Sequence, residues 1–220
     1  MKNKAISSSE AIRNKETQCQ RVWEKALDFF ETYFIDKKVI YEYKENMRSK
    51  HISQVTIEFE KSNFLHLCGL QVDKHQPKNI RPTMFWKEIV NKRFNSNHWQ
   101  LSDEIMALGS DPKRYFTWKT AALISINELL STKVCLTKAQ RYDHLVFDIM
   151  VRSHKETIGL ALKKTNQFYR IISTINLSSQ LSNKAASLQK MPVTSVYSLD
   201  RNGNKKLLLQ NSTVSAQKNL

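Results

Sequence analysis

The chain has 220 residues, 40% of them hydrophobic and 25% charged, which suits one well-buried domain and excludes two large ones. Its 4 glycines and 4 prolines exclude a linker-rich or low-complexity protein. The formal net charge of +15, from 35 Lys and Arg against 20 Asp and Glu, makes a polyanion the expected partner, and nucleic acid is the commonest one.

The first predicted element is a long amphipathic helix. Ser7-Ser8-Ser9-Glu10 offers the capping residues with which helices commonly begin. Apolar residues then recur at spacings of three and four, so they share one face that would pack on a core. This face consists of Cys19, Val22, Trp23, Ala26, Phe30, Tyr33 and Phe34.

A β-hairpin should follow, and it leads into the stretch around which we expect the protein to be organised. Residues 38–43 and 54–60 alternate between apolar and polar side chains, which is the period of half-buried strands. Directly after them, the apolar residues of 64–70 crowd around His66, and Gly69 provides the permissive backbone that ends the turn. An imidazole held there could exchange a proton near neutral pH, although a lone histidine in an apolar stretch is often only a packed side chain.

Helical patterns dominate the next part of the chain. Residues 71–81 are polar and typical of a loop, and residues 83–94 and 101–108 then predict two helices. A third helix should begin with Asp111 as its N-cap and Pro112 at its first helical position, and run to about Leu130.

The chain changes character near Ser131, where short β-rich runs separated by polar turns predict an antiparallel meander. A terminal hairpin should turn at Asn202-Gly203. Residues 176–189 resemble a polar connection with a helical turn, and residues 211–220 resemble a loose tail. The predicted strands are 133–136, 145–151, 157–162, 167–173, 193–199 and 205–209.

Helices followed by strands predict an α+β domain, in which the N-terminal helices and the hairpin pack with a C-terminal antiparallel sheet. We expect a single domain over residues 1–210, with a helical elaboration near 82–131. The 3 cysteines, Cys19, Cys68 and Cys135, lack CxxC or Cys/His zinc spacing, which indicates reduced thiols in a cytoplasmic protein. No apolar window approaches the length of about 18 residues that a membrane span needs, and no signal-peptide core is present.

Several standard catalytic sites can be set aside. The sequence has no GxGxxG or GxxxxGK(S/T) phosphate loop, no HExxH metal motif and no GxSxG elbow, and the pair Asp143-His144 has no second cluster near it. We therefore expect no metal and no cofactor. RNA can be cleaved without either, because its own 2′-hydroxyl can attack the adjacent phosphate while side chains exchange protons and cations stabilise the phosphorane.

The run around His66 carries a resemblance. It reads Asn63-Phe64-Leu65-His66-Leu67-Cys68-Gly69-Leu70 and resembles the N-F-x-H-L-T/C-G motif of a phage-type family within the barnase, EndoU, colicin and RelE-like (BECR) nuclease superfamily. The order of helix, hairpin, motif, short strands and terminal hairpin extends the likeness from about Glu24 to Leu209. It implies two N-terminal helices with a four-stranded antiparallel sheet, and a small metal-independent ribonuclease that serves as a toxin or as an effector of a phage or mobile element.

The resemblance also implies roles for individual residues. His66 would be the general acid or base, and Lys61 would contact phosphate. Arg170 would stabilise the phosphorane as a bidentate donor, with Tyr169 and Ser173 on the same strand as further catalytic candidates. Solvated or packed side chains are the plainer interpretation of each. The other candidate nucleic-acid contacts are Lys163, Lys164 and Trp99, the tryptophan that we expect to be exposed because it lies in a loop.

The sequence thus predicts a cytoplasmic, metal-independent RNA endonuclease from a phage or mobile element, with an antitoxin or immunity protein as a further partner. Two alternatives stay open. One is a non-catalytic basic nucleic-acid-binding protein, and the other is a structural or adaptor protein whose charge only reflects an AT-rich genome. A membrane partner is not expected, because the basic residues are spread along the chain instead of forming one polybasic segment.

Overall fold

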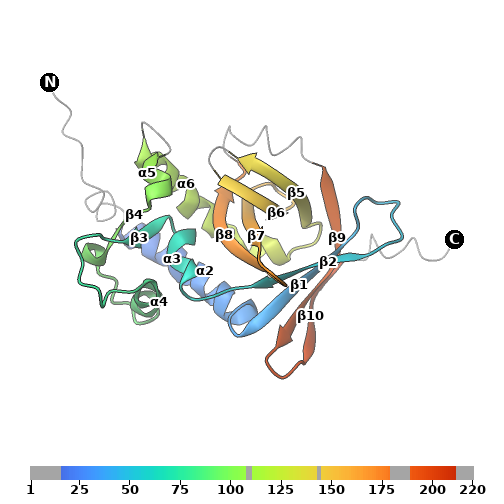
Figure 1. Ribbon diagram of the computed structural model, residues 1–220, viewed down its shortest axis with the longest axis horizontal. Coiled ribbons are helices and arrows are strands. Elements are labelled where there is room, and N and C mark those ends of the chain that lie inside the picture. The colour runs from blue at the N-terminus through green and yellow to red at the C-terminus, as the bar shows by residue number, and fades with distance from the viewer. Residues whose placement is uncertain (1–15, 108–110, 143–144, 179–188, 212–220) are drawn as a thin grey trace.

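The computed structural model describes residues 16–107, 111–142, 145–178 and 189–211. In Figure 1 most of the helices gather on the left and the large sheet lies on the right. The helices are α2 (Glu16–Tyr33), α3 (Asn63–Leu67), α4 (Pro82–Val90), α5 (Asp103–Ala107) and α6 (Pro112–Ile124), with the 3-10 turns η1 (Ser96–His98) and η2 (Ile126–Leu130). The strands are β1 (Lys37–Tyr43), β2 (Ser53–Glu58), β3 (Leu70–Val72), β4 (Trp99–Leu101), β5 (Cys135–Tyr142), β6 (Leu145–Arg152), β7 (Ile158–Lys164), β8 (Tyr169–Asn176), β9 (Lys190–Asp200) and β10 (Lys205–Gln210).

Seven of the described strands close into a barrel, so the predicted α+β packing of helices and a hairpin with a C-terminal sheet is wrong. The strands follow the order β1-β2-β8-β7-β6-β5-β9, and β9 pairs with β1 to close the ring. β10 is an additional strand that pairs with β9. The hairpin of β1 and β2 is therefore part of the barrel wall, and the helices lie beside the barrel (Figure 1).

The ring closes through pairings between segments that are far apart in the sequence. β2 runs parallel to β8, with Ile57 opposite Tyr169 and Glu58 opposite Arg170. β1 runs antiparallel to β9 over nearly its whole length. Alternating side chains predict that each segment is a strand, but they do not say which distant strand it meets. Local patterns therefore did not predict that the hairpin and the later strands pair in one ring.

One continuous hydrophobic core extends from the barrel strands to the helices. Tyr41 on β1 is fully buried, and its hydroxyl donates to the Leu129 carbonyl at 3.2 Å, which fastens η2 to the barrel wall. On the helical side, Trp23 of α2 makes edge-to-face contacts with Phe85 of α4 and with Phe94, each at a ring-centroid distance of 5.3 Å. The aromatic face predicted for the first helix thus packs on this core, as amphipathic helices do.

Most of the predicted elements are confirmed, although their assembly is not. β1 and β2 pair as the expected hairpin, and Asp111 caps α6 by accepting a hydrogen bond from the Arg114 N–H at 3.1 Å. Gly203 turns the β9–β10 hairpin with a φ of +85°. The small sheet of β3 and β4 was not predicted, because three-residue strands are too short to show a period.

Some predictions fall on residues that the structure does not describe. They are the start of the first helix within residues 1–15, the helical turn within 179–188 and most of the tail, 212–220. Among the helices that are described, none has both the length and the apolar character needed to cross a bilayer.

Asn211 joins three strands at the point where β9 changes partners. One edge of β9 pairs with β5 at residues 190–192 and with β10 at residues 195–199. Asn211 is only 3% exposed, and its Nδ2 donates to the Val193 carbonyl at 2.7 Å while its Oδ1 accepts from the Lys133 N–H at 3.1 Å. One side chain therefore hydrogen-bonds backbone groups of two segments where β5 gives way to β10.

Replacing Asn211 with alanine should destabilise the fold by about 2 kcal/mol, because the buried Val193 carbonyl and the part-buried Lys133 N–H both lose their hydrogen bond to this side chain. Urea denaturation followed by circular dichroism measures the change in the free energy of unfolding. Gln210→Ala, at the neighbouring exposed side chain, is the matched control and should stay within about 0.5 kcal/mol of the parent protein. Equal effects of the two substitutions would contradict this role of Asn211.

Candidate active site

His66 projects from the exposed side of α3. The helix buries Phe64, Leu65 and Leu67, each 0% exposed, whereas His66 is exposed. At 3.6 residues per turn, three buried residues at these positions leave the histidine on the opposite side of the helix. The Asn63 side chain closes the preceding turn by accepting a hydrogen bond from the Glu60 N–H at 3.1 Å. The plainer interpretation of His66, a packed core histidine, therefore does not hold.

α3 lies along β8 at the point where β2 ends. The parallel pairing of β2 with β8 stops at Glu58 and Arg170, and the chain continues in the same direction as α3. At the far end of α3, the Thr174 hydroxyl donates to the Leu67 carbonyl at 2.9 Å. Figure 1 shows the short helix beside this strand. The histidine motif is therefore brought to the strand that carries the other predicted catalytic residues.

Lys119 of α6 connects His66 to that strand. Its Nζ donates to the Ser173 hydroxyl at 2.8 Å and to the His66 backbone carbonyl at 3.4 Å. A half-buried ammonium group thus lies between the turn that holds the imidazole and β8. Lys119 was not among the predicted site residues, because a single lysine within a helix looks like ordinary solvated surface. Only the packing of α6 against α3 and β8 reveals it.

A β-bulge in β8 aligns Ser173 with Arg170. The register shifts between the pairs Leu162–Ile171 and Ala161–Ser173, which leaves one extra residue in β8. Arg170 lies opposite Lys163, and Lys163 and Ala161 share a face of β7 because they are two residues apart. Arg170 and Ser173 therefore share a face as well, which a regular strand would not allow for residues three apart.

Arg170 reaches the turn that precedes α3. Its guanidinium lies 3.2 Å from the Glu60 carboxylate, and both side chains are more than half exposed. An exposed pair of this kind contributes little to stability, so the guanidinium can exchange its carboxylate for another anion at small cost. Ser173, by contrast, is only 3% exposed. The structure thus places Arg170 on the surface at one end of α3, and Ser173 beneath Lys119 at the other.

The remaining candidates on these strands differ in their surroundings. Lys163 pairs with Asp148 at 3.2 Å, and the Lys164 backbone N–H donates to the same carboxylate at 2.7 Å. This backbone hydrogen bond, helped by the Lys163 ammonium, holds the pKa of Asp148 below its ordinary value. Tyr169 is half-buried opposite Lys164, and desolvation raises its pKa. Both lysines are exposed at the end of β7, close to Arg170.

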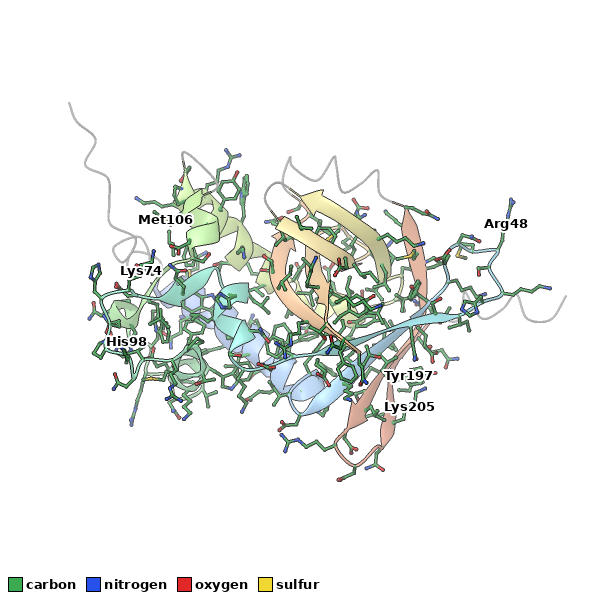
Figure 2. All side chains as sticks on the ribbon, viewed as in Figure 1. Arg48, Lys74, His98, Met106, Tyr197 and Lys205 are labelled. Atoms are coloured by element: carbon green, nitrogen blue, oxygen red, sulfur yellow. The ribbon has the colours of Figure 1, made fainter. Side chains whose placement is uncertain are left out.

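Lys61 and Trp99, the two predicted nucleic-acid contacts on the helical side, differ in their exposure. Lys61 is exposed, and its ammonium lies 5.6 Å from the ring centroid of Trp86. The prediction that Trp99 is exposed is wrong, because this residue is 0% exposed and its Nε1 donates to Glu88 at 2.8 Å. Trp99 starts β4 in the unforeseen small sheet, next to His98, which Figure 2 places at the helical end of the molecule. A buried indole cannot stack on a base.

Two other residues of the motif have structural explanations. Gly69 has a φ of +77°, and a Cβ there would lie 2.5 Å from Ile105 Cδ1 and 3.2 Å from Lys119 Cδ. The glycine therefore allows the Lys119 side chain to run close beneath the turn. Cys68 is fully buried, and burial raises the pKa of its thiol well above the ordinary value, so it stays a neutral core residue.

Together these residues offer one exposed imidazole, an ammonium bonded to the backbone carbonyl of the same histidine, and an exposed guanidinium at the other end of the same helix. That set can exchange a proton and can stabilise a phosphate that gains negative charge. Arg170 lies at one end of α3 and Ser173 at the other, where Lys119 links it to the His66 carbonyl, whereas Trp99 is buried in the small sheet. The pair Asp143-His144 lies outside the described residues.

Gly69→Ala should destabilise the protein more than Gly203→Ala, although both glycines have a positive φ. The strain of a left-handed backbone costs about 1 kcal/mol at either position. At Gly203 no atom lies within 4 Å of the added methyl group, whereas at Gly69 the clash with Ile105 should add about 1–3 kcal/mol. Urea denaturation of both variants measures the difference, and equal losses of stability would show that the close approach of Ile105 and Lys119 is unimportant.

One of the three comparisons with known proteins agrees with the motif. Comparison with curated proteins and with solved structures finds no match. A family model described as phage-Barnase-EndoU-ColicinE5/D-RelE like nuclease 4 matches residues 24–213, which include every residue of the site described above. The chain therefore belongs to this family of phage BECR-like nucleases.

Proposed function

We propose that this nuclease is a metal-independent RNA endonuclease in which His66 transfers a proton and the cations around α3 stabilise the transition state. The observation that supports the proposal most strongly is that the motif histidine is exposed while Lys119 holds its carbonyl from below. An imidazole can take up or release a proton, so it can serve as a base or as an acid. The proposal would place the cleaved phosphate over α3.

In the proposed reaction the ribose 2′-oxygen attacks the adjacent phosphorus, and the bond from phosphorus to the 5′-oxygen breaks. His66 either takes the proton from the 2′-hydroxyl or gives one to the departing 5′-oxygen, and the products are a 2′,3′-cyclic phosphate and a 5′-hydroxyl. The positive charge of Lys119 and the guanidinium of Arg170 would offset the charge on the phosphorane. Arg170 would exchange Glu60 for two phosphate oxygens, which its planar fork suits.

The other candidates receive supporting roles in this proposal. Ser173 is buried, so it would position Lys119 through its 2.8 Å hydrogen bond without touching RNA. The RNA chain would leave the site past Arg170, where it would contact Tyr169, Lys163 and Lys164. Lys61 would contact phosphate at the other side of α3. A ribonuclease of this kind would act in the cytoplasm as a phage or mobile-element effector, with an antitoxin or immunity protein to restrain it.

His66→Ala should lower the rate of RNA cleavage by at least about 100-fold, because proton transfer by a positioned side chain typically contributes that much. Purified protein is incubated with total RNA in EDTA, and the 2′,3′-cyclic phosphate ends are quantified. His75→Ala is the control, since His75 is also exposed but lies in the loop after β3, and it should cleave at the parental rate. Tight RNA binding without cleavage by the parent protein would support the non-catalytic binding module instead, and binding that is insensitive to salt would support the adaptor.

Lys119→Met should lower kcat by about 100-fold while KM changes little, because the lost charge acts mainly on the transition state. Lys119→Arg restores the positive charge and should recover part of that loss. Steady-state kinetics on a short RNA measure both variants, with circular dichroism as the check on folding. A Met variant that keeps the parental kcat, or an Arg variant no better than Met in a folded protein, would show that the charge of Lys119 is not used.

A further inference from the structure

Trp118 differs from the other tryptophans of the chain. Trp23, Trp86 and Trp99 are 0 to 2% exposed and belong to the hydrophobic core. Trp118 is half-buried, and among the described residues it packs into neither of the two hydrophobic clusters. Its ring contacts are with neighbours on its own helix: the Arg114 guanidinium lies 4.4 Å from the ring centroid, and Tyr115 meets it edge-on at 5.2 Å. This tryptophan is therefore available for contact at the surface, beside a guanidinium and a second aromatic ring.

The position of Trp118 relates it directly to the proposed catalytic residues. It precedes Lys119 on α6, and its carbonyl accepts a hydrogen bond from the Asn176 side chain at 3.2 Å, so it lies beside the end of β8. Lys119 contacts the same strand at Ser173. Ser173 and Asn176 are three residues apart on β8, which corresponds to about 10 Å. A few nucleotides of single-stranded RNA can bridge that distance.

Basic side chains surround this aromatic pair. Lys113 and Arg114 are exposed in the first turn of α6, and Lys119 follows one turn after Tyr115. Because the Asp111 side chain already occupies the start of the helix, the attraction for an anion comes from these side chains and not from the helix end. Aromatic residues interleaved with lysine and arginine are how proteins bind single-stranded nucleic acid, with bases stacked on rings and phosphates held by cations.

We infer that Trp118, together with Arg114 and Tyr115, is a stacking platform for an unpaired RNA base that lies a few nucleotides from the phosphate at His66. The inference rests on the proposed function for its choice of RNA as the ligand. It makes single-stranded RNA the substrate class, because a base within a duplex is already stacked on its neighbours and cannot lie on an indole. It also makes the contact tolerant of sequence, since every base has a face that can stack.

The test uses a single-stranded RNA 12-mer labelled with fluorescein and the His66→Ala protein in EDTA, so that binding is measured without cleavage. Adding Trp118→Leu should raise the Kd from fluorescence anisotropy by about 5- to 100-fold, whereas Trp118→Phe should keep most of the affinity. Ile124→Ala is the control on the same helix, because Ile124 is 62% exposed, and it should bind like its parent. A duplex of the same RNA should bind equally well with and without Trp118.

Two further readouts separate stacking from a structural effect. Bound RNA should quench the indole fluorescence of the His66→Ala protein, and Trp118→Phe should remove most of this quenching because the other tryptophans are buried. Arg114→Ala should reduce the slope of log Kd against log salt by about 1, while Trp118→Leu should leave that slope unchanged.

The outcomes distinguish this inference from the proposed reaction. Unchanged Kd and unchanged quenching in the Trp118 variants, with normal cleavage by the parent protein, would overturn the platform and leave the ribonuclease. Loss of affinity and of quenching in a parent protein that never cleaves RNA would support the platform and overturn the ribonuclease. A Trp118→Leu protein that melts at the same temperature as the Ile124→Ala control but binds the duplex and the single strand equally weakly would also overturn the platform.

Discussion

The contact between α3 and β8 is the constraint on which the site depends. A helix of five residues is not stable by itself, because the free-energy cost of nucleation exceeds the stabilisation from the hydrogen bonds of one turn. Here the Thr174 hydroxyl holds the last turn, and Lys119 holds the carbonyl of the histidine itself. Tertiary hydrogen bonds and three buried apolar side chains therefore hold α3 against the barrel strand. They fix the position of the backbone from which the exposed imidazole projects.

The barrel and the helices contribute different parts to this arrangement. Closure of the barrel makes β8 a rigid strand whose bulge puts Arg170 and Ser173 on one face. α6 supplies what the strands lack, an ammonium beside the histidine and an aromatic pair beyond it. Sites built on strands and helices hold their groups more firmly than sites on loops do. One small helix thus has a cation from β8 at one end and a cation from α6 at the other.

How much of this could be predicted from the sequence differs from residue to residue. The motif around His66 and the alternating strands are local patterns, and both were found. The parallel pair of β2 and β8 was not, because register between distant strands leaves no local trace. Lys119 was not predicted either, because only its tertiary packing distinguishes it from an ordinary solvated lysine. Trp99 was chosen over Trp118 because a loop position suggested exposure, whereas the unforeseen β3–β4 pair buried it.

The long separation between the paired segments also governs when the site can exist. Leu67 and Thr174 are 107 positions apart, and the ring around β8 closes only when β9 reaches β1. Contacts of such high sequence separation form late, after the intervening loop has been closed. Until β8 has been synthesised and has left the ribosome, the histidine helix has no strand to pack against. A nuclease organised in this way cannot complete the barrel that supports its candidate site until the last barrel strand has emerged.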